Sequence, residues 1–375
     1  MDETTAVKRL CHSLHMPPAP SCLPFDVIIE ILCRLPVKFL LQLCCVCKSW
    51  NSLILTDHKF AKKHLRMSTK RQHLITTTRW ILSEEFAIIS YPLDSVPLQS
   101  ILTSKGTRLD YSPDIQNYRY GLVASCDGLL CFVINDHQAY IYNPCIRKVK
   151  QLPYVDLPHV STHCLYAFGY DPFIDNYKVI VVQENDHKTE VKVHTLGTDS
   201  WRRIKNIPSK FRYGRRGIFV SGTVNWLTCY SIGFNDLKAI VSLHLGKESY
   251  QEIPVPDNGN FIFDSSTLDI MRDCLCIFSR RTFDSPTDVW LMKEYGDKDS
   301  WIKLFRLPYF GDSGYFFTRI LYISEDNHVM VVFKELGKLN WVVYDYKNDT
   351  IKCSKIEEKL IWVESKVYAE SLISP

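Results

Sequence analysis

The sequence predicts an α+β protein of two domains, in which a small all-helical domain precedes an all-β domain built like a propeller. Apolar residues recur at helical spacing between residues 22 and 66. After them, a strand–turn–strand pattern returns about every fifty residues. Residues 366–372 then alternate like one more strand. We therefore expect about six four-stranded blades, closed into a ring by the C-terminal strand.

Composition limits the possible functions of the chain. Its 375 residues leave room for the small domain and one large domain. Hydrophobic residues make up 46% and charged residues 23%, which is typical of a globular protein. The net charge of +4 is too small to indicate binding to nucleic acid or a membrane surface. No apolar run reaches the ~18 residues of a membrane helix. We expect neither a nucleic acid nor a membrane as partner.

Residues 1–21 are predicted to be a flexible tail. They contain three prolines and no signal-peptide core. Without a secretion signal, the 14 cysteines are expected to be reduced. This indicates a cytoplasmic or nuclear protein, or one present in both compartments.

In the helical domain, residues 22–66, Pro24 suits the first turn of the first helix, and Asp26 favours the positive end of the helix dipole. We expect Pro36 to end this helix. The apolar residues on one side of it are Val27, Ile28, Ile31, Leu32 and Leu35.

Three further short helices are expected in this domain, through residues 39–43, 46–54 and 60–65. A unit of about 45 residues seldom buries enough apolar surface to fold on its own core. The domain therefore either packs against the rest of the chain or docks onto another protein. The apolar pattern alone does not decide between these alternatives.

Several separated motifs resemble the F-box, particularly its plant form. They are Leu23-Pro24-x-Asp26, Glu30-Ile31-Leu32, Arg34-Leu35-Pro36-Val37-Lys38 and Val46-Cys47-Lys48-x-Trp50. The resemblance implies that residues 22–66 bind a Skp-type adaptor, which tethers the chain to a cullin ubiquitin ligase. The adaptor-binding residues that it implies are Leu23, Pro24, Val27, Ile28, Ile31, Leu32, Leu35, Pro36, Val46, Cys47 and Trp50. Some of these must pack inside the F-box, and the sequence does not separate the two groups.

The rest of the chain repeats a hairpin pattern. Its turns begin at Asn143, Gly197, Gly246, Gly296 and Lys347, about fifty residues apart. A second strand group precedes most of these hairpins, so each repeat has about four strands, as in a propeller blade. Five blades would fill residues 122–356. Residues 72–93 and the C-terminal strand would form a mixed sixth blade. The alternative is an open or irregular sandwich made of the same hairpins.

The strongest internal similarity joins two segments of the repeat that lie one hundred residues apart. Asp199-Ser200-Trp201 is echoed by Asp299-Ser300-Trp301. Both segments end at a proline, and Leu152-Pro153 and Ile253-Pro254 are related endings elsewhere. A proline can end a strand where no ladder donor is needed.

The repeat region resembles the plant F-box-associated domain, in the group that includes F-box/kelch-repeat and S-locus F-box proteins. The resemblance implies that residues 67–375 recruit the protein that is to be ubiquitinated. No Gly-Gly pair typical of true kelch repeats is present, so the propeller prediction depends mostly on the period. The motifs are Ser125-Cys126-Asp127-Gly128-Leu129-Leu130-Cys131, Tyr142-Asn143-Pro144, Phe168-Gly169-Tyr170-Asp171-Pro172, Tyr177-Lys178-Val179, Gly222-Thr223-Val224-Asn225-Trp226-Leu227 and Tyr368-Ala369-Glu370-Ser371-Leu372.

The sequence contains weak signals of other chemistry. Cys44, Cys47, His58 and His64 approach a zinc-finger pattern, but the middle spacing is short and a helix there would spread the ligands. The segment Gly311-Asp312-Ser313-Gly314 is similar to the nucleophile loop of trypsin-like proteases, without a matching His or Asp motif. We predict no metal, no cofactor and no catalytic residue.

One basic segment is a candidate contact for the target protein. Its cationic and aromatic residues could bind an acidic partner, or RNA by stacking. The alternative is a solvated loop between blades. The residues are Lys210, Phe211, Arg212, Tyr213, Arg215 and Arg216.

The predicted function is that of a substrate-recognition subunit of an SCF-type ubiquitin ligase, without catalysis of its own. Two alternatives remain. One is a propeller enzyme with a site in the central channel, which would need converging carboxylates or histidines. The other is a scaffold that recruits nothing for degradation.

Overall fold

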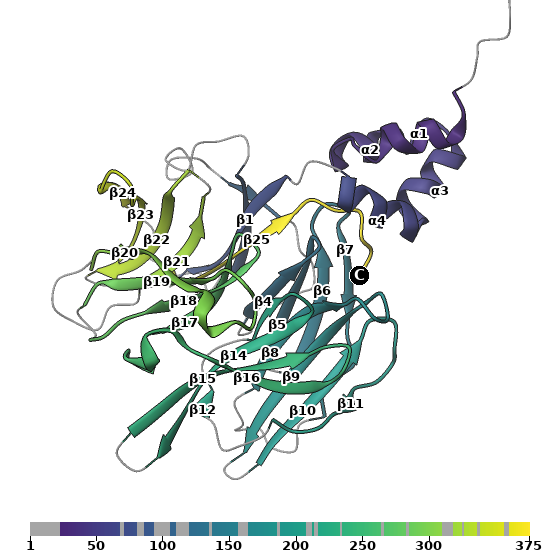
Figure 1. The fold of residues 1–375 in the computed structure, drawn as a ribbon. Coiled ribbons are helices and arrows are strands. Elements are labelled where there is room, and N and C mark those ends of the chain that lie inside the picture. The colour runs from purple at the N-terminus through teal and green to yellow at the C-terminus, as the bar shows by residue number, and fades with distance from the viewer. Residues whose placement is uncertain are drawn as a thin grey trace, which may run out of the picture. The chain divides into compact units, whose positions relative to one another are not determined.

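The computed structural model describes residues 23–67, 71–80, 86–93, 106–109, 120–134, 137–156, 164–185, 188–207, 212–213, 217–232, 235–263, 266–282, 285–309, 318–324, 326–335, 338–355 and 360–375. The chain divides into two units, residues 1–69 and 70–375. The described part of the first unit is helical, and that of the second consists almost entirely of strands (Figure 1). The predicted tail, residues 1–21, lies outside the described residues.

The helices of the first unit are short and follow one another closely. They are α1 (Phe25–Leu32), α2 (Val37–Leu43), α3 (Lys48–Thr56) and α4 (His58–Met67). Asp57 begins α4, because its Oδ1 atom accepts hydrogen bonds from the backbone N–H groups of Lys59 and Phe60 at 2.8 and 3.0 Å.

Two expected helix boundaries were wrong. The helix α1 ends at Leu32 instead of continuing to Pro36, and Pro36 precedes the first residue of α2 with φ −58° and ψ 146°. Proline disfavours a helical conformation in the residue before it and suits a helix start, so Pro36 begins the second helix. Similarly, Cys47 is extended and α3 begins only at Lys48.

The interior of the helical unit is small. His64 closes it, because its Nε2 atom forms a 2.8 Å hydrogen bond with the carbonyl oxygen of Leu35 in the turn between α1 and α2. At its edge, Glu30 forms ion pairs with Lys63 and Arg34. The buried apolar residues are Leu32, Cys33, Val37, Leu40, Leu53, Ile54, Phe60 and Ala61.

Among the described residues of the second unit, strands form six antiparallel sheets, which we call blades A to F. Blade A consists of β25 (Leu360–Ala369), β1 (Gln72–Trp80), β2 (Phe86–Pro92) and β3 (Thr107–Arg108). Blade B consists of β4 (Tyr120–Cys126), β5 (Leu129–Ile134), β6 (Gln138–Asn143) and β7 (Lys148–Gln151). Blade C consists of β8 (Cys164–Asp171), β9 (Asn176–Asn185), β10 (Lys188–Thr195) and β11 (Arg202–Arg203).

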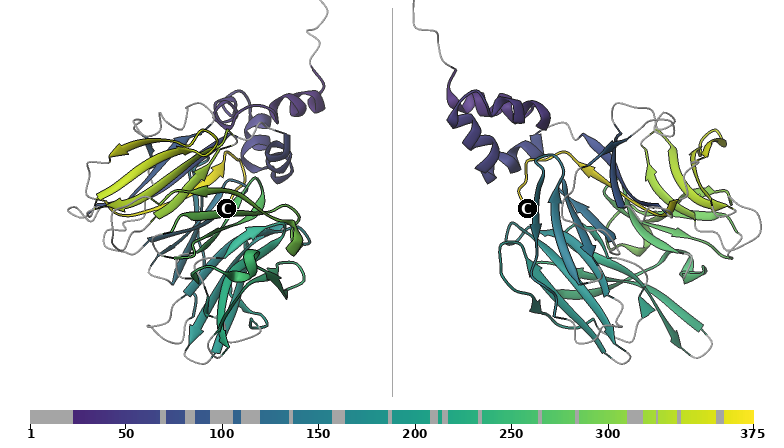
Figure 2. Two further views of the ribbon diagram at one scale, coloured as in Figure 1. Left: turned by 60° about the vertical axis from the view of Figure 1, so that its left-hand side comes forward. Right: turned by 180° about the vertical axis from the view of Figure 1, so that it is seen from behind.

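The remaining blades continue the repeat (Figure 2). Blade D consists of β12 (Arg212–Tyr213), β13 (Ile218–Val220), β14 (Thr223–Ile232), β15 (Asn235–His244) and β16 (Ser249–Pro254). Blade E consists of β17 (Thr267–Met271), β18 (Cys274–Ser279), β19 (Thr287–Met292) and β20 (Trp301–Leu307). Blade F consists of β21 (Thr318–Ile323), β22 (His328–Glu335), β23 (Lys338–Asp345) and β24 (Thr350–Lys355). The prediction of about six four-stranded blades is confirmed.

The ring closes as predicted, through a strand from each end of the unit. Strand β25 pairs with β1 from Gln72, opposite Ala369, to Trp80, opposite Leu360, and the yellow β25 lies beside the blue β1 in Figure 1. The chain then continues onto blade B, where the Nδ2 atom of Asn143 donates to the carbonyl oxygens of Ser371 and Ile373 at 3.0 and 2.7 Å. The C-terminal residues therefore join blade A to blade B.

Apolar side chains fill the spaces between neighbouring blades. Trp226, which we expected in the core, is fully buried among residues of blades C and D, including Ile180 and Val193. A second cluster joins blades E and F around Val289 and Val331. Burial between blades makes the ring one cooperative unit.

The echoed Asp-Ser-Trp segments perform the same structural role twice. The Nε1 atom of Trp201 in blade C donates to the carbonyl oxygen of Pro153, just after blade B, at 2.8 Å. The Nε1 atom of Trp301 in blade E donates to the carbonyl oxygen of Pro254 in blade D at 3.0 Å. In both places, a tryptophan is hydrogen-bonded to a proline at or just after the end of the outer strand of the preceding blade.

A buried hydrogen-bond network joins blade D to the end of β19. The hydroxyl group of Tyr295 accepts from the Oγ1 atom of Thr223, donates to the Oδ1 atom of Asn225, and bonds to the Oγ atom of Ser242, each at 2.6 Å. The Nδ2 atom of Asn225 donates to the carbonyl oxygen of Ile218 at 3.1 Å. The network explains the polar residues in the motif Gly222-Thr223-Val224-Asn225-Trp226.

The variant Tyr295→Phe is expected to reduce the free energy of unfolding by about 1–3 kcal/mol, because three buried polar side chains lose a common partner. Urea denaturation followed by tryptophan fluorescence measures this change. The control Tyr154→Phe alters an exposed tyrosine and is expected to change stability by less than about 0.5 kcal/mol. Equal effects of the two variants would show that the network contributes little.

Asp288 is expected to make the stability of the protein depend on pH. It is almost fully buried and lies 2.7 Å from the Nζ atom of Lys303 and 2.7 Å from the Nε atom of Arg306. Burial alone would raise the pKa of Asp288, but the hydrogen bonds from Arg306 and Lys303 hold this pKa below its ordinary value. A lowered folded-state pKa stabilises the protein above the unfolded value of about 3.9, and this stabilisation is lost as pH falls through the folded value.

The variant Asp288→Asn is therefore expected to be less stable than the wild type by about 1–3 kcal/mol at pH 7. The difference should shrink steadily once pH falls below about 4. Urea denaturation at pH 7, 5 and 3 measures it. A difference that stays constant over this range would contradict the assignment of a stabilising carboxylate.

Candidate functional site

The helix α1 has one buried side and one exposed apolar side. Leu32 is 2% exposed and packs in the interior, whereas Val27 and Ile31 are 41% and 49% exposed. Val27 and Ile31 are four residues apart, so they lie on the same face of the helix. Leu23, just before α1, is also exposed. The result is an apolar surface row parallel to the helix axis.

The structure divides the predicted adaptor-binding residues into groups that the sequence did not separate. The exposed ones are Leu23, Pro24, Val27, Ile31, Val46 and Cys47. The half-buried ones are Ile28, Leu35, Pro36 and Trp50. Leu32 belongs to the interior, so we correct its predicted role as a surface contact. Leu32 supports the exposed row from beneath.

Two exposed aromatic residues were missed by the sequence analysis. Phe25 begins α1, and Phe39 lies on α2, and about half of each side chain is exposed. Neither belongs to the motifs that carry the F-box resemblance. Both increase the apolar surface of the first two helices, and a monomeric protein rarely exposes so many large apolar side chains close together in sequence.

Three of the four residues in the zinc-finger-like pattern form other contacts. The Sγ atom of Cys44 donates to the carbonyl oxygen of Leu40 at 3.4 Å. The Sγ atom of Cys47 lies 3.1 Å from the Oγ atom of Ser49. His64 is bonded to Leu35, as described above. In the part of the chain that the structure describes, no group of three or more His, Cys, Asp or Glu side chains could hold a metal ion.

The basic segment is described only in part. Arg212 and Tyr213 form strand β12, whose partners on β14 are Cys229 and Thr228. Strand β13 pairs with the beginning of the same edge of β14. The described residues of the segment therefore continue the inner strand of blade D, which corrects the alternative of a plain loop at this point. Lys210, Phe211, Arg215 and Arg216 lie outside the described residues.

The enzyme alternative requires acidic or basic groups that meet at the inner strands. Lys366 on β25 and Asp269 on β17 do so, with 3.3 Å between Nζ and Oδ1. Blade F separates their blades, so this ion pair spans the middle of the ring. Glu364 accepts a hydrogen bond from the backbone N–H of Leu122 at 2.7 Å. These contacts stabilise the inner strands, and the trypsin-like segment at residues 311–314 lies outside the described residues.

A serine, a histidine and a glutamate lie in a hydrogen-bonded row where the ring closes. The Oγ atom of Ser90 is 3.2 Å from Nδ1 of His73, and Nε2 of His73 is 3.1 Å from Oε1 of Glu370. The order is similar to that of a nucleophile, base and acid. Ser90, however, is buried and also bonded to the hydroxyl group of Tyr368 at 3.1 Å. A substrate cannot reach it there, so the row joins β1 and β2 to the C-terminal residues.

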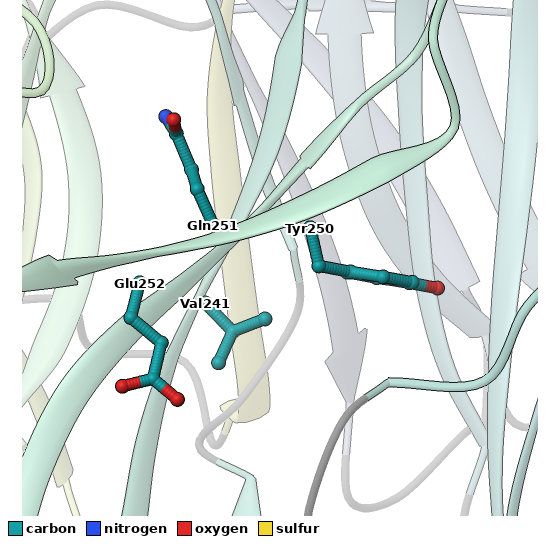
Figure 3. A pocket seen from close by; sticks show the side chains of 4 residues that line it. All are labelled: Val241, Tyr250, Gln251 and Glu252. Atoms are coloured by element: carbon teal, nitrogen blue, oxygen red, sulfur yellow. The ribbon is translucent and has the colours of Figure 1, made fainter.

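A small cavity lies on the outer strands of blade D. Its volume is about 80 Å³ and its lining residues are Val241, Tyr250, Gln251 and Glu252. Figure 3 shows that the side chain of Gln251 leaves its strand on the side opposite to Glu252 and Val241. Small-molecule sites typically have volumes of roughly 300–1,000 Å³. This cavity is too small for such a ligand.

Among the described helices, none has both the length and the apolar character that crossing a bilayer would demand.

Comparisons with known proteins agree with both units of the chain. Residues 79–375 match the family described as the F-box associated beta propeller domain. Residues 20–62 match the F-box domain.

Relatives match over almost the whole chain. An F-box/kelch-repeat protein of Arabidopsis thaliana is 30% identical, and the match covers 100% of this chain and 99% of the relative. The F-box protein CPR1 of the same plant is 26% identical over 94% of this chain and 88% of its own. Among solved structures, TolB from Acinetobacter baumannii has a TM-score of 0.51 at 9% identity, covering 80% of this chain and 66% of TolB. That likeness concerns the fold alone.

Mutations can distinguish how the buried and exposed faces of α1 contribute to stability. Leu32→Ala is expected to destabilise the helical unit by about 2–5 kcal/mol, because it leaves a cavity in a small core. Ile31→Ala removes a side chain of similar size from the surface and is expected to change stability by less than about 1 kcal/mol. Urea denaturation followed by circular dichroism at 222 nm, where the helices dominate, measures both. Similar losses in the two variants would contradict the division of the face.

Proposed function

The chain belongs to the F-box proteins that carry an F-box associated beta propeller domain, and we propose that it is the substrate-recognition subunit of an SCF-type ubiquitin ligase. In this proposal, residues 22–66 dock a Skp-type adaptor and, through it, a cullin. Residues 67–375 hold a target protein. Cytoplasm and nucleus are the compartments in which such a complex would act.

The exposed apolar row of the helical unit is the observation that carries the proposal. Val27, Ile31 and Val46 are 41%, 49% and 61% exposed. An apolar surface of this kind is stabilised when another protein removes it from water. Phe25 and Phe39 extend this surface, and aromatic side chains often anchor interfaces between proteins. We therefore add both to the adaptor-binding residues.

The propeller contributes rigidity rather than chemistry. Its ring is closed by a strand pair, and the buried carboxylates of its described residues, Asp171, Asp288 and Glu364, are held in hydrogen bonds or ion pairs. A rigid ring bound to the ligase raises the effective concentration of the target's lysines near the ubiquitin-charged enzyme. No bond is made or broken by this chain in the proposed role.

A scaffold that binds the adaptor without causing degradation remains the alternative. The half-life of a bound target, measured with and without the chain, separates the two roles.

The double variant Val27→Asp with Ile31→Asp is expected to abolish co-purification of the adaptor, because two carboxylates would lose water in an apolar interface. The control Ile351→Asp alters an exposed isoleucine of similar exposure on β24 and is expected to leave adaptor binding intact. Both variants should retain the circular dichroism spectrum of the wild type. Undiminished adaptor binding by the double variant would refute the docking proposal.

A further inference from the structure

Among the described residues of the propeller, one buried positive charge has no negative partner. Among the described residues, Lys178 and Arg280 are the lysine and arginine that are less than one-tenth exposed. Lys178 is neutralised, because its Nζ atom lies 2.8 Å from Oδ2 of Asp171 and 3.4 Å from Oε1 of Glu248. Arg280 is 8% exposed and forms no ion pair with any carboxylate of the described residues.

Two hydrogen bonds hold Arg280 in place, one through its side chain and one through its backbone. Its Nε atom donates to the Oγ1 atom of Thr287 at 2.7 Å. Its carbonyl oxygen accepts from the backbone N–H of Ile262, in the segment that connects blade D to blade E, at 2.7 Å. With Nε occupied, the two terminal nitrogens remain, and they have no hydrogen-bond partner within the described part of the chain. A guanidinium group held this way presents a preorganised edge of donors.

A small part of Arg280, 8% of its surface, remains exposed. The enclosed side-chain atoms that lack a partner in the described residues include Nδ1 of His194 and Nε1 of Trp226, but neither terminal nitrogen of Arg280. Burial lowers the pKa of Arg280, and Tyr309 opposes this effect. An arginine nevertheless stays charged in proteins. The site therefore combines a largely buried, charged side chain with two terminal nitrogens that have no partner among the described residues.

A buried cation without a counter-ion is destabilising, because it loses hydration without gaining an ion pair. All the carboxylates of the described residues that are equally buried are compensated, as Asp171, Asp288 and Glu364 show. Locally destabilising arrangements of this kind are typical of binding sites. An anion supplied by a ligand would compensate the charge of Arg280.

The position of Arg280 suits a contact with a target. Arg280 directly follows β18, so it lies at the end of the ring opposite to the β17–β18 turn at Arg272 and Asp273. Strand β12 of the basic segment is likewise paired with β14 far from the turn where β14 begins. Both sites belong to neighbouring blades at the same end of the ring.

We propose that Arg280 is an anion-binding subsite, at which a target protein places a carboxylate or phosphate against the two terminal nitrogens. Two oxygens of either group match two parallel N–H donors. The identity of the ligand as a target protein rests on the proposed function, whereas the anion site itself does not.

The test uses the full chain in complex with its adaptor, and inorganic phosphate and acetate as separate probes at constant ionic strength. Thermal unfolding midpoints are measured against probe concentration for wild type, Arg280→Gln and the matched control Arg281→Gln. A ligand that binds the folded state raises the midpoint. We expect one probe to raise the midpoint of wild type and of Arg281→Gln. Its affinity for Arg280→Gln should be at least about tenfold lower.

The probe that gives this effect distinguishes a phosphate from a carboxylate. Without a probe, Arg280→Gln should unfold at the same temperature as wild type or higher, because it removes an uncompensated buried charge. If that variant does not fold, Arg280→Lys replaces it, since lysine keeps the charge but loses the two-nitrogen edge. Equal midpoint shifts in all variants, or no shift with either probe, would overturn the proposal. Adaptor co-purification is scored separately, so a failed anion test leaves the ligase role standing.

Discussion

The antiparallel pairing of β25 with β1 is the constraint on which the second unit depends. It joins residues almost three hundred positions apart and leaves blade A with its full set of strands. Without it, β1 would expose an unpaired edge, and exposed edges favour association with other chains. The same strand carries Glu364 and Lys366 to the middle of the ring, where they contact blades B and E. The closing strand therefore also stabilises the inner strands of blades B and E, through these two contacts.

The contacts between blades repeat as the blades themselves do. Tryptophans at two equivalent positions bond to a proline at or just after the end of the preceding outer strand. Polar interactions such as the Tyr295 network and the pair of Lys178 with Asp171 lie between apolar clusters. Fully satisfied polar groups allow one arrangement of the blades and make others unfavourable. A rigid ring of this kind can present a small number of fixed contacts, of which the tip of Arg280 is the one we assign.

The helical unit illustrates how a small domain divides its apolar residues. Leu32 and Leu40 complete an interior that includes the hydrogen bond of His64, while Val27 and Ile31 lie outside it. Residues that face the other helices are buried. Four short helices are too few to cover both sides of α1. The residues left outside form the surface that we assign to the adaptor.

The sequence alone determined the order of the helices, the six-blade period and the closing strand, because periodicity and turn residues are local signals that survive without tertiary context. It also identified the motif residues of both domains. The end of α1 was misjudged, since Pro36 suits the beginning of α2 as well as the end of α1. Only the tertiary structure separated Leu32 from Ile31, because adjacent apolar residues look alike until a neighbouring helix covers one of them. It alone also revealed that Arg280 has no counter-ion among the described residues, since burial and distances between side chains are properties of the folded chain.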